Sequence, residues 1–300
     1  MGQRTEFDDG SWRHHFIPEH FIKGFVDSEG SLFRYDKDED QIARRKFAPK
    51  QVFFQPDGNT ANVGLIRTTL AETYSSSLDS DLSSQLTRIR ENSTNPLTNN
   101  VENYATLLSI AADLFFRVPS NDAYYNLLYE RSGLQALDKD GNVIEAAQEL
   151  LETGRFAQKT LKSLLPQNFL GQLLKQTAVH DRMQPRIAAF SYGVFVLSDN
   201  PVVFSELPTR WQDFMQNFIL PISSTQFFIY CDKPGYGREL SLPLNYNALA
   251  IEQAQRYVCS GSEVVLSAAV KYWKELRVKG YLPGKELTIF EDAIREEGVQ

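Results

Sequence analysis

The chain has 300 residues, a formal net charge of −7 and an isoelectric point near 5.3, values that argue against a globally basic nucleic-acid-binding protein. Its hydrophobic fraction of 42% is enough for a sizeable core and argues against a disordered chain. A local basic patch is still compatible with this acidic balance, because a binding cleft needs only a small positive surface.

Cysteine spacing and hydropathy indicate in which cellular compartment the protein is expected. Cys231 and Cys259 are not spaced as metal ligands, and they fit a reduced cytoplasm better than a disulfide framework. No apolar run approaches the roughly 18 residues that a membrane helix needs. The first residues, MGQRTEFDDGSW, are polar and acidic, unlike a signal peptide. We therefore expect a cytoplasmic protein with no membrane partner.

The first predicted elements are a strand and a helix. Residues Ser31–Tyr35 alternate apolar and polar side chains before a run of acids, which is typical of a short strand. A helix is expected from about residue 63 to residue 91, because four apolar residues fall on one helical stripe: Leu78, Leu82, Leu86 and Ile89.

The next predicted helix, from about Val101 to Arg117, is apolar nearly all round its circumference. A helix of this kind is typical of the centre of a fold. Pro119 ends it. Helical patterns continue to about residue 189.

After residue 189 the pattern changes to that of strands. Three short segments are rich in aromatic and β-branched residues and are bounded by turn formers, namely 192–198, 217–223 and 225–231. Helical patterns then return at about 247–259 and 263–279.

The expected fold class is α+β, because helices and strands are segregated along the chain. We predict a single compact domain over residues 1–300 that is mostly helical. Its helical middle would span about 63–189 and its sheet-bearing C-terminal part about 190–280. One small antiparallel sheet is expected, built from the N-terminal strand and residues of about 191–243.

The opening segment HHFIPEHFIKGF holds three of the four histidines of the chain. His14, His15 and His20 contain no i, i+4 pair, and no cysteine stands at a metal-ligand spacing, so the pattern does not indicate a zinc site. Packed or surface positions are the expectation for His14 and His20.

The segment FVLSDNPVVF carries Ser198, Asp199 and Asn200 to the end of an apolar strand, where Pro201 restricts the turn. Polar groups held at such a strand end can face a cleft and are often catalytic. The alternative is an Asx-turn in which the carboxylate of Asp199 binds nearby backbone amides. The residues alone favour the turn.

Together these segments resemble a bacterial family of unknown function, DUF4238. The opening segment is similar to its His-aromatic-aliphatic-Pro start, Arg117–Pro119 to its Arg-x-Pro, and Ser198–Pro201 to its Ser-Asp-Asn-Pro, over about Arg13 to Ser262 in all. The family usually carries a glutamate in its first long helix. The nearest acids here are Glu72, Asp79 and Asp81, and none of them is matched to it.

The resemblance implies a group of recurrent polar positions: His15, Arg117, Asp199 and Asn200. Such a set could supply an acid or base, an anion clamp, an orienting carboxylate and a hydrogen-bond donor for phosphodiester hydrolysis. It implies an effector of anti-phage defence or a toxin that acts as a nuclease or phosphodiester hydrolase. The tips of His15, Arg117 and Asp199 are then predicted to lie close together.

The partners and cofactors follow from the same resemblance. A nucleic-acid substrate is expected, with a divalent metal (Mg²⁺ or Mn²⁺) left open and a protein partner from a defence or toxin–antitoxin operon. The basic trio Arg44, Arg45 and Lys46 would hold the flanking phosphates. The alternative is a non-catalytic sensor or partner-binding subunit, in which the polar group is only a buried network that specifies the fold.

Overall fold

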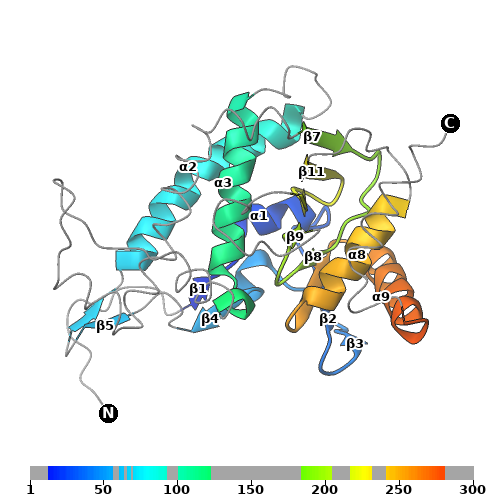
Figure 1. Cartoon of the computed structure of the whole chain (residues 1–300). Coiled ribbons are helices and arrows are strands. Elements are labelled where there is room, and N and C mark those ends of the chain that lie inside the picture. The colour runs from blue at the N-terminus through cyan, green and yellow to red at the C-terminus, as the bar shows by residue number, and fades with distance from the viewer. Residues whose placement is uncertain are drawn as a thin grey trace, which may run out of the picture.

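The computed structural model describes residues 13–56, 61–63, 66–68, 70–92, 101–122, 184–204, 217–231 and 241–280. Figure 1 shows helices α2 (Leu70–Asn92) and α3 (Val101–Arg117) side by side at one end of the molecule. Helices α8 (Ser241–Gln253) and α9 (Glu263–Val278) pack together at the other end. The main strands lie between these two helix pairs.

Two four-stranded antiparallel sheets lie in the described part of the chain. The first has the order β7-β11-β10-β9, and its strands are β7 (Gln184–Ala189), β9 (Val203–Phe204), β10 (Phe218–Pro221) and β11 (Gln226–Cys231). Every residue of β10 and β11 is buried, so both faces of this sheet are covered where these strands lie. Their aromatic and β-branched residues suit such a position.

The second sheet joins distant parts of the chain. Its order is β3-β2-β12-β8, and its strands are β2 (Phe33–Asp36), β3 (Gln41–Ile42), β8 (Leu197–Ser198) and β12 (Tyr257–Ser260). The hairpin between β2 and β3 turns at Asp40, whose φ of 50° lies in the left-handed region that Asp tolerates better than most residues.

The remaining described elements are short. Strand β1 (Arg13–His15) pairs with β4 (Phe54–Pro56), and β5 (Ala61–Val63) pairs with β6 (Ile66–Thr68). Helix α1 (Glu19–Ile22) is followed by a 3-10 turn, and two further 3-10 turns occur; their bounds are Lys23–Phe25, Pro49–Gln51 and Pro119–Asn121.

The prediction of a central helix at 101–117 is confirmed. The apolar side chains of α3 from Leu107 to Phe116 are at most 3% exposed. Helix α9 also lies where it was predicted, and the hydroxyl oxygen of Ser262 caps it by accepting a hydrogen bond from the backbone N–H of Val265.

The prediction of a mostly helical protein with one small sheet is wrong. Residues 184–189, read as helical, form β7, and 257–259, read as the end of a helix, belong to β12, an inner strand of the second sheet. The N-terminal strand pairs with this β12 rather than with a strand of 191–243. A short apolar run fits either a buried strand or a buried helix, so its neighbours in space decide. The predicted helical residues 123–183 lie outside the described residues.

One buried arginine fixes the opening segment to the rest of the fold. The guanidinium of Arg90 donates hydrogen bonds to the carbonyl oxygens of Ile222, His20 and Phe21 at 2.6, 3.0 and 2.8 Å. Burial lowers the pKa of Arg90 to about 9. A side chain at Gly24 would overlap this guanidinium, so glycine is needed there. The contacts hold α1, α2 and β10 in one arrangement.

Both cysteines are buried, and they are not joined in a disulfide. Among the described residues, no helix is both long and apolar enough to span a membrane.

Candidate functional site

A cavity of about 910 Å³ lies between the opening segment, the second sheet and the corner that follows β8. Its aromatic lining comes from several segments, and the rings belong to Phe16, Phe47, Phe53, Phe54 and Tyr257. Three arginines, two acids and three glutamines supply its polar lining: Arg34, Arg45, Arg256, Asp38, Asp199, Gln51, Gln55 and Gln255. A volume in this range and a mixed lining are usual for small-ligand sites.

Asp199 stands on the wall of this cavity, and its carboxylate binds three backbone amides. Its Oδ1 accepts a hydrogen bond from the N–H of Gln255 at 2.8 Å, and its Oδ2 accepts from Arg256 at 2.7 Å and Tyr257 at 2.8 Å. Burial raises the pKa of Asp199, while the three amides and Lys37 oppose that rise. The carboxylate therefore fixes the connection between α8 and β12, whose amides are distant in sequence.

The other polar side chains of this corner, Ser198–Pro201, also form hydrogen bonds within the protein. The hydroxyl of Ser198 donates to the carbonyl oxygen of Asn200 at 2.7 Å. The side-chain amides of Asn200 and Asn121 bind each other at 3.2 and 3.3 Å. Gln253 donates to the carbonyl oxygen of Asn200 at 2.5 Å. Asn200 therefore joins the corner to the residues after α3 and to α8.

Arg117 forms a buried ion pair within its own helix. Its Nε donates to Oδ1 of Asp113 at 2.9 Å, and the two side chains are 9% and 7% exposed. A bidentate phosphate clamp needs a guanidinium that faces the ligand. The contact with Asp113 instead gives Arg117 a role in holding the end of α3.

The histidines of the opening segment occupy different environments. His14 is buried, and the carbonyl oxygen of the half-buried His20 accepts a hydrogen bond from Arg90. The side chain of His15 is 16% exposed, its Nδ1 lies 3.8 Å from Oε1 of Glu19, and its ring centroid lies 6.0 Å from that of Phe54. An adjacent carboxylate of this kind can orient an imidazole.

The segments of the predicted group converge on one cavity. Phe16 follows His15, Pro119 comes two residues after Arg117, and both line the cavity with Asp199. Of the four predicted residues, Asp199 is the one among the described lining residues. Contact among the tips of His15, Arg117 and Asp199 stays a prediction. The side chains of Glu72, Asp79 and Asp81, on α2, lie outside the described residues.

Sequence reasoning missed Arg34. Its guanidinium carbon lies 4.1 Å from the ring centroid of Phe47 and 4.4 Å from that of Tyr257. Its Nε is buried without a hydrogen-bond partner, and no carboxylate of the described residues forms an ion pair with it. An arginine within the predicted strand Ser31–Tyr35 could have indicated a functional residue. The contact with Tyr257 could not be predicted, because Tyr257 was expected to lie in a helix.

The basic trio is divided by the fold. Arg45 lines the cavity with its guanidinium carbon 4.7 Å from the ring centroid of Phe47. Lys46 instead pairs with Asp27 at 2.7 Å and with Glu29 at 2.9 Å. Arg44 is exposed and is not among the described residues that line the cavity.

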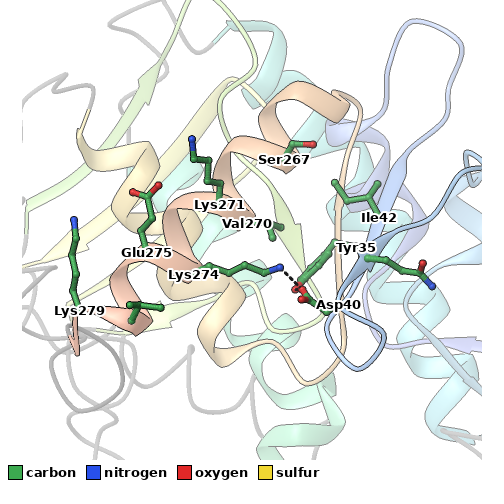
Figure 2. A pocket seen from close by; sticks show the side chains of 11 residues that line it. Tyr35, Asp40, Ile42, Ser267, Val270, Lys271, Lys274, Glu275 and Lys279 are labelled. Atoms are coloured by element: carbon green, nitrogen blue, oxygen red, sulfur yellow. Dashed lines mark hydrogen bonds and ion pairs between the residues drawn. The ribbon is translucent and has the colours of Figure 1, made fainter.

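A second cavity, of about 590 Å³, lies between the β2–β3 hairpin and α9. Figure 2 shows Lys274 reaching across it to Asp40, which also accepts a hydrogen bond from the hydroxyl of Tyr35 at 2.7 Å. Lys271 and Lys279 point away from this pair. Because the cation that faces inward already has a carboxylate, this cavity is a weaker candidate for binding an anion than the one beside Arg34.

No group of three or more His, Cys, Asp or Glu side chains in the described ranges is arranged to hold a metal ion. A comparison with curated proteins and with solved structures found no significant match in either set. The sequence profile of one family, described as a protein of unknown function (DUF4238), matches residues 13–263. This match covers the opening segment, both four-stranded sheets and the cavity beside Arg34, and the chain therefore belongs to the DUF4238 family.

Proposed function

We propose that the protein is a cytoplasmic effector of bacterial anti-phage defence, or a toxin, that binds nucleic acid in the Arg34 cavity and hydrolyses its phosphodiester bonds. The observation that carries the proposal is the guanidinium of Arg34, which faces a cavity with no carboxylate partner among the described residues. A desolvated cation without an anion is costly unless a ligand supplies the missing charge.

Phosphate suits this guanidinium better than a carboxylate-bearing peptide does. Guanidinium binds phosphate through parallel N–H bonds, and no carboxylate of the described residues forms an ion pair with Arg34. The partly exposed aromatic rings of Phe16 and Phe54 line the same cavity, and such rings can stack on bases. A ligand that carries both phosphate and planar rings is a nucleotide or a nucleic-acid strand.

The proposed reaction uses Asp199 and Arg34, which line the cavity, and His15, which precedes the lining residue Phe16. Water attacks phosphorus, a base takes its proton, and the departing oxygen receives a proton from an acid. Asp199, with a raised pKa and only one amide on its Oδ1, would take the proton of the water. His15 would supply the proton to the leaving oxygen. Arg34 stabilises the phosphoryl oxygens, the role that the sequence gave to Arg117.

The second candidate is a non-catalytic sensor or partner-binding subunit of a defence or toxin–antitoxin system. The observation that favours it is the saturation of the corner, where Asp199 and Asn200 each hold distant segments together. Under this alternative the cavity binds its anionic ligand but cleaves no bond. A protein partner instead recognises the ligand-bound state.

The test is single-turnover cleavage of RNA and DNA by purified protein, with and without Mg²⁺ or Mn²⁺, together with growth arrest on expression. We expect cleavage that Arg34→Gln reduces at least tenfold and that Arg44→Gln leaves unchanged. Arg44 is the matched control because it is a nearby arginine outside the cavity. Binding of nucleic acid without cleavage in every condition would favour the sensor, and neither binding nor cleavage would overturn both.

A further inference from the structure

Three arginines and two aromatic rings alternate along one wall of the cavity. Their order is Arg45, Phe47, Arg34, Tyr257 and Arg256, and all five line the cavity. Each guanidinium carbon lies between 4.1 and 4.9 Å from the centroid of the neighbouring ring. We call this arrangement the arginine ladder. It is assembled from β2, the segment after β3 and the start of β12.

The rings determine which side of each guanidinium can meet a ligand. The guanidinium carbon of Arg34 lies over the rings of both Phe47 and Tyr257, so these rings occupy part of the space around the group and restrict how a ligand approaches it. Stacking also restricts the side chain, so little conformational freedom is lost when phosphate binds. The ladder is therefore a set of guanidinium groups whose positions are restricted by the neighbouring rings before a ligand binds.

Only part of the ladder is neutralised by the protein itself. Arg256 donates to Oδ2 of Asp36 at 2.9 Å and lies 3.4 Å from Oδ2 of Asp38. Arg34 and Arg45 form no ion pair with any carboxylate in the described residues. The ladder thus offers two successive cations that are available to anionic groups of a ligand.

We propose that the arginine ladder binds successive phosphates of a single, unpaired nucleic-acid strand. This inference rests on the proposed function and specifies its substrate. Two adjacent unpaired cations match a ligand with repeated anionic groups better than they match an isolated phosphate. The acidic chain, with a net charge of −7, offers no general attraction to polyanions, so binding depends on this local array.

The position of the ladder selects a single strand over a duplex. Phe47 is buried and Arg34 is half-buried in the cavity, whereas Arg45, which also lines the cavity, is exposed. A duplex keeps its bases paired inside and presents a rigid outer surface. An unpaired strand can bend into the cavity, place its phosphates on the ladder and stack its bases on rings such as those of Phe16 and Phe54.

The experiment measures binding and its salt dependence by fluorescence anisotropy in EDTA, with labelled oligo-dT and oligo-rU, a duplex of equal length, and ATP and pyrophosphate as competitors. We expect the strands to bind at least tenfold more tightly than the duplex. Arg34→Gln and Arg45→Gln should each weaken strand binding at least tenfold, since hydrogen bonds to charged groups are strong. Each should reduce the slope of log K against log salt by about 0.7.

The matched control is Arg44→Gln, which removes the same charge next to the ladder but outside the cavity. It should leave the affinity and the salt slope unchanged. Arg34→Lys keeps the charge without the planar fork, so it should lower affinity while keeping most of the slope. Thermal melting of each variant shows whether the fold is retained, and Arg45→Gln carries the test if an Arg34 variant unfolds.

Three outcomes would overturn the inference: equal affinity for duplex and strand, equal loss of affinity in Arg44→Gln, or ATP or pyrophosphate binding as tightly as a strand. Cleavage assays on the same strands separate this inference from the proposed function. Ladder-dependent strand binding without cleavage refutes the hydrolase and supports the ladder. Cleavage that is insensitive to Arg34 and Arg45 refutes the ladder and the role given to Arg34 in the reaction, while hydrolase activity itself stands.

Discussion

The corner at Ser198–Pro201 and the arginine ladder border the same cavity, yet they differ in how far the protein itself supplies partners for their polar groups. In the corner, Asp199 accepts hydrogen bonds from three backbone amides and Asn200 pairs with Asn121. In the ladder, the guanidinium of Arg34 has two rings over it but no carboxylate among the described residues. Saturated polar groups hold a fold together, whereas preorganised cations without anions are suited to a ligand.

The largest effect is expected from removing the carboxylate of the corner. Asp199→Ala leaves three partly buried backbone amides without their carboxylate acceptor, so the free energy of unfolding should fall by about 3–5 kcal/mol. Urea denaturation followed by circular dichroism measures this loss. Asp38→Ala is the control, because Asp38 lines the same cavity with a side chain that is 67% exposed, and it should cost less than about 1 kcal/mol. Similar losses in both variants would remove the distinction between the two regions.

The apolar core sets a scale for these effects. Leu108→Ala and Phe115→Ala should each lower the free energy of unfolding by about 2–5 kcal/mol, because both side chains are buried in α3. The same urea titration applies. If both variants unfolded at the wild-type urea concentration, α3 would not be part of the stabilising core.

Asn121→Ala tests the side-chain amide pair alone. The change removes the partner of the Asn200 amide and a donor to the carbonyl oxygen of Phe115, so a loss of about 1–3 kcal/mol is expected. Strand binding should persist at temperatures where the variant is folded. A loss of binding without a loss of stability would instead place the pair at the ligand site.

Arg34→Gln should have the opposite effect, with little change in stability and a large loss of anion binding. It removes two cation–π contacts that are worth about 0.5–1 kcal/mol each at exposed sites, and it also relieves a partly buried unpaired charge. We therefore expect the free energy of unfolding to change by less than about 1 kcal/mol while anion binding is lost. A large loss of stability would show that Arg34 belongs with the structural residues of the corner.

The sequence predicted features that depend on neighbouring residues and missed those that depend on distant ones. Helix α3 was predictable because its apolar residues all lie in one continuous segment of the sequence. That Asp199 binds backbone amides was predictable from its place at a strand end, but its partners at 255–257 were not local to it. The second sheet and the ladder both need Tyr257 in a strand, and Tyr257–Ser260 is a strand because β2 and β8 lie on either side of it.

The smallest expected effect is on the stability of the fold at low pH. It involves Asp36, which pairs with Arg256 of the ladder. Burial alone would raise the pKa of Asp36, but hydrogen bonds from Arg256 and from backbone amides outweigh it and hold the pKa below 3.8. A carboxyl group whose pKa is lowered by folding contributes stability above its unfolded pKa, and this contribution is lost as the pH falls through the folded pKa. Because Arg256 is largely solvated, the loss should stay below about 1 kcal/mol.

Asp36→Asn should therefore flatten the decrease in stability below about pH 4, as measured by urea titrations at a series of pH values. The same change removes the main counterion of Arg256, so the end of the ladder gains a partly unpaired cation. At pH 7 the variant should bind a single strand more tightly and with a salt slope steeper by up to about 0.7. Asp40→Asn, in the same hairpin but at the second cavity, should leave strand binding unchanged. If Asp36→Asn and Asp40→Asn changed the salt slope equally, the ladder would be responding to net charge rather than to its own ion pairs.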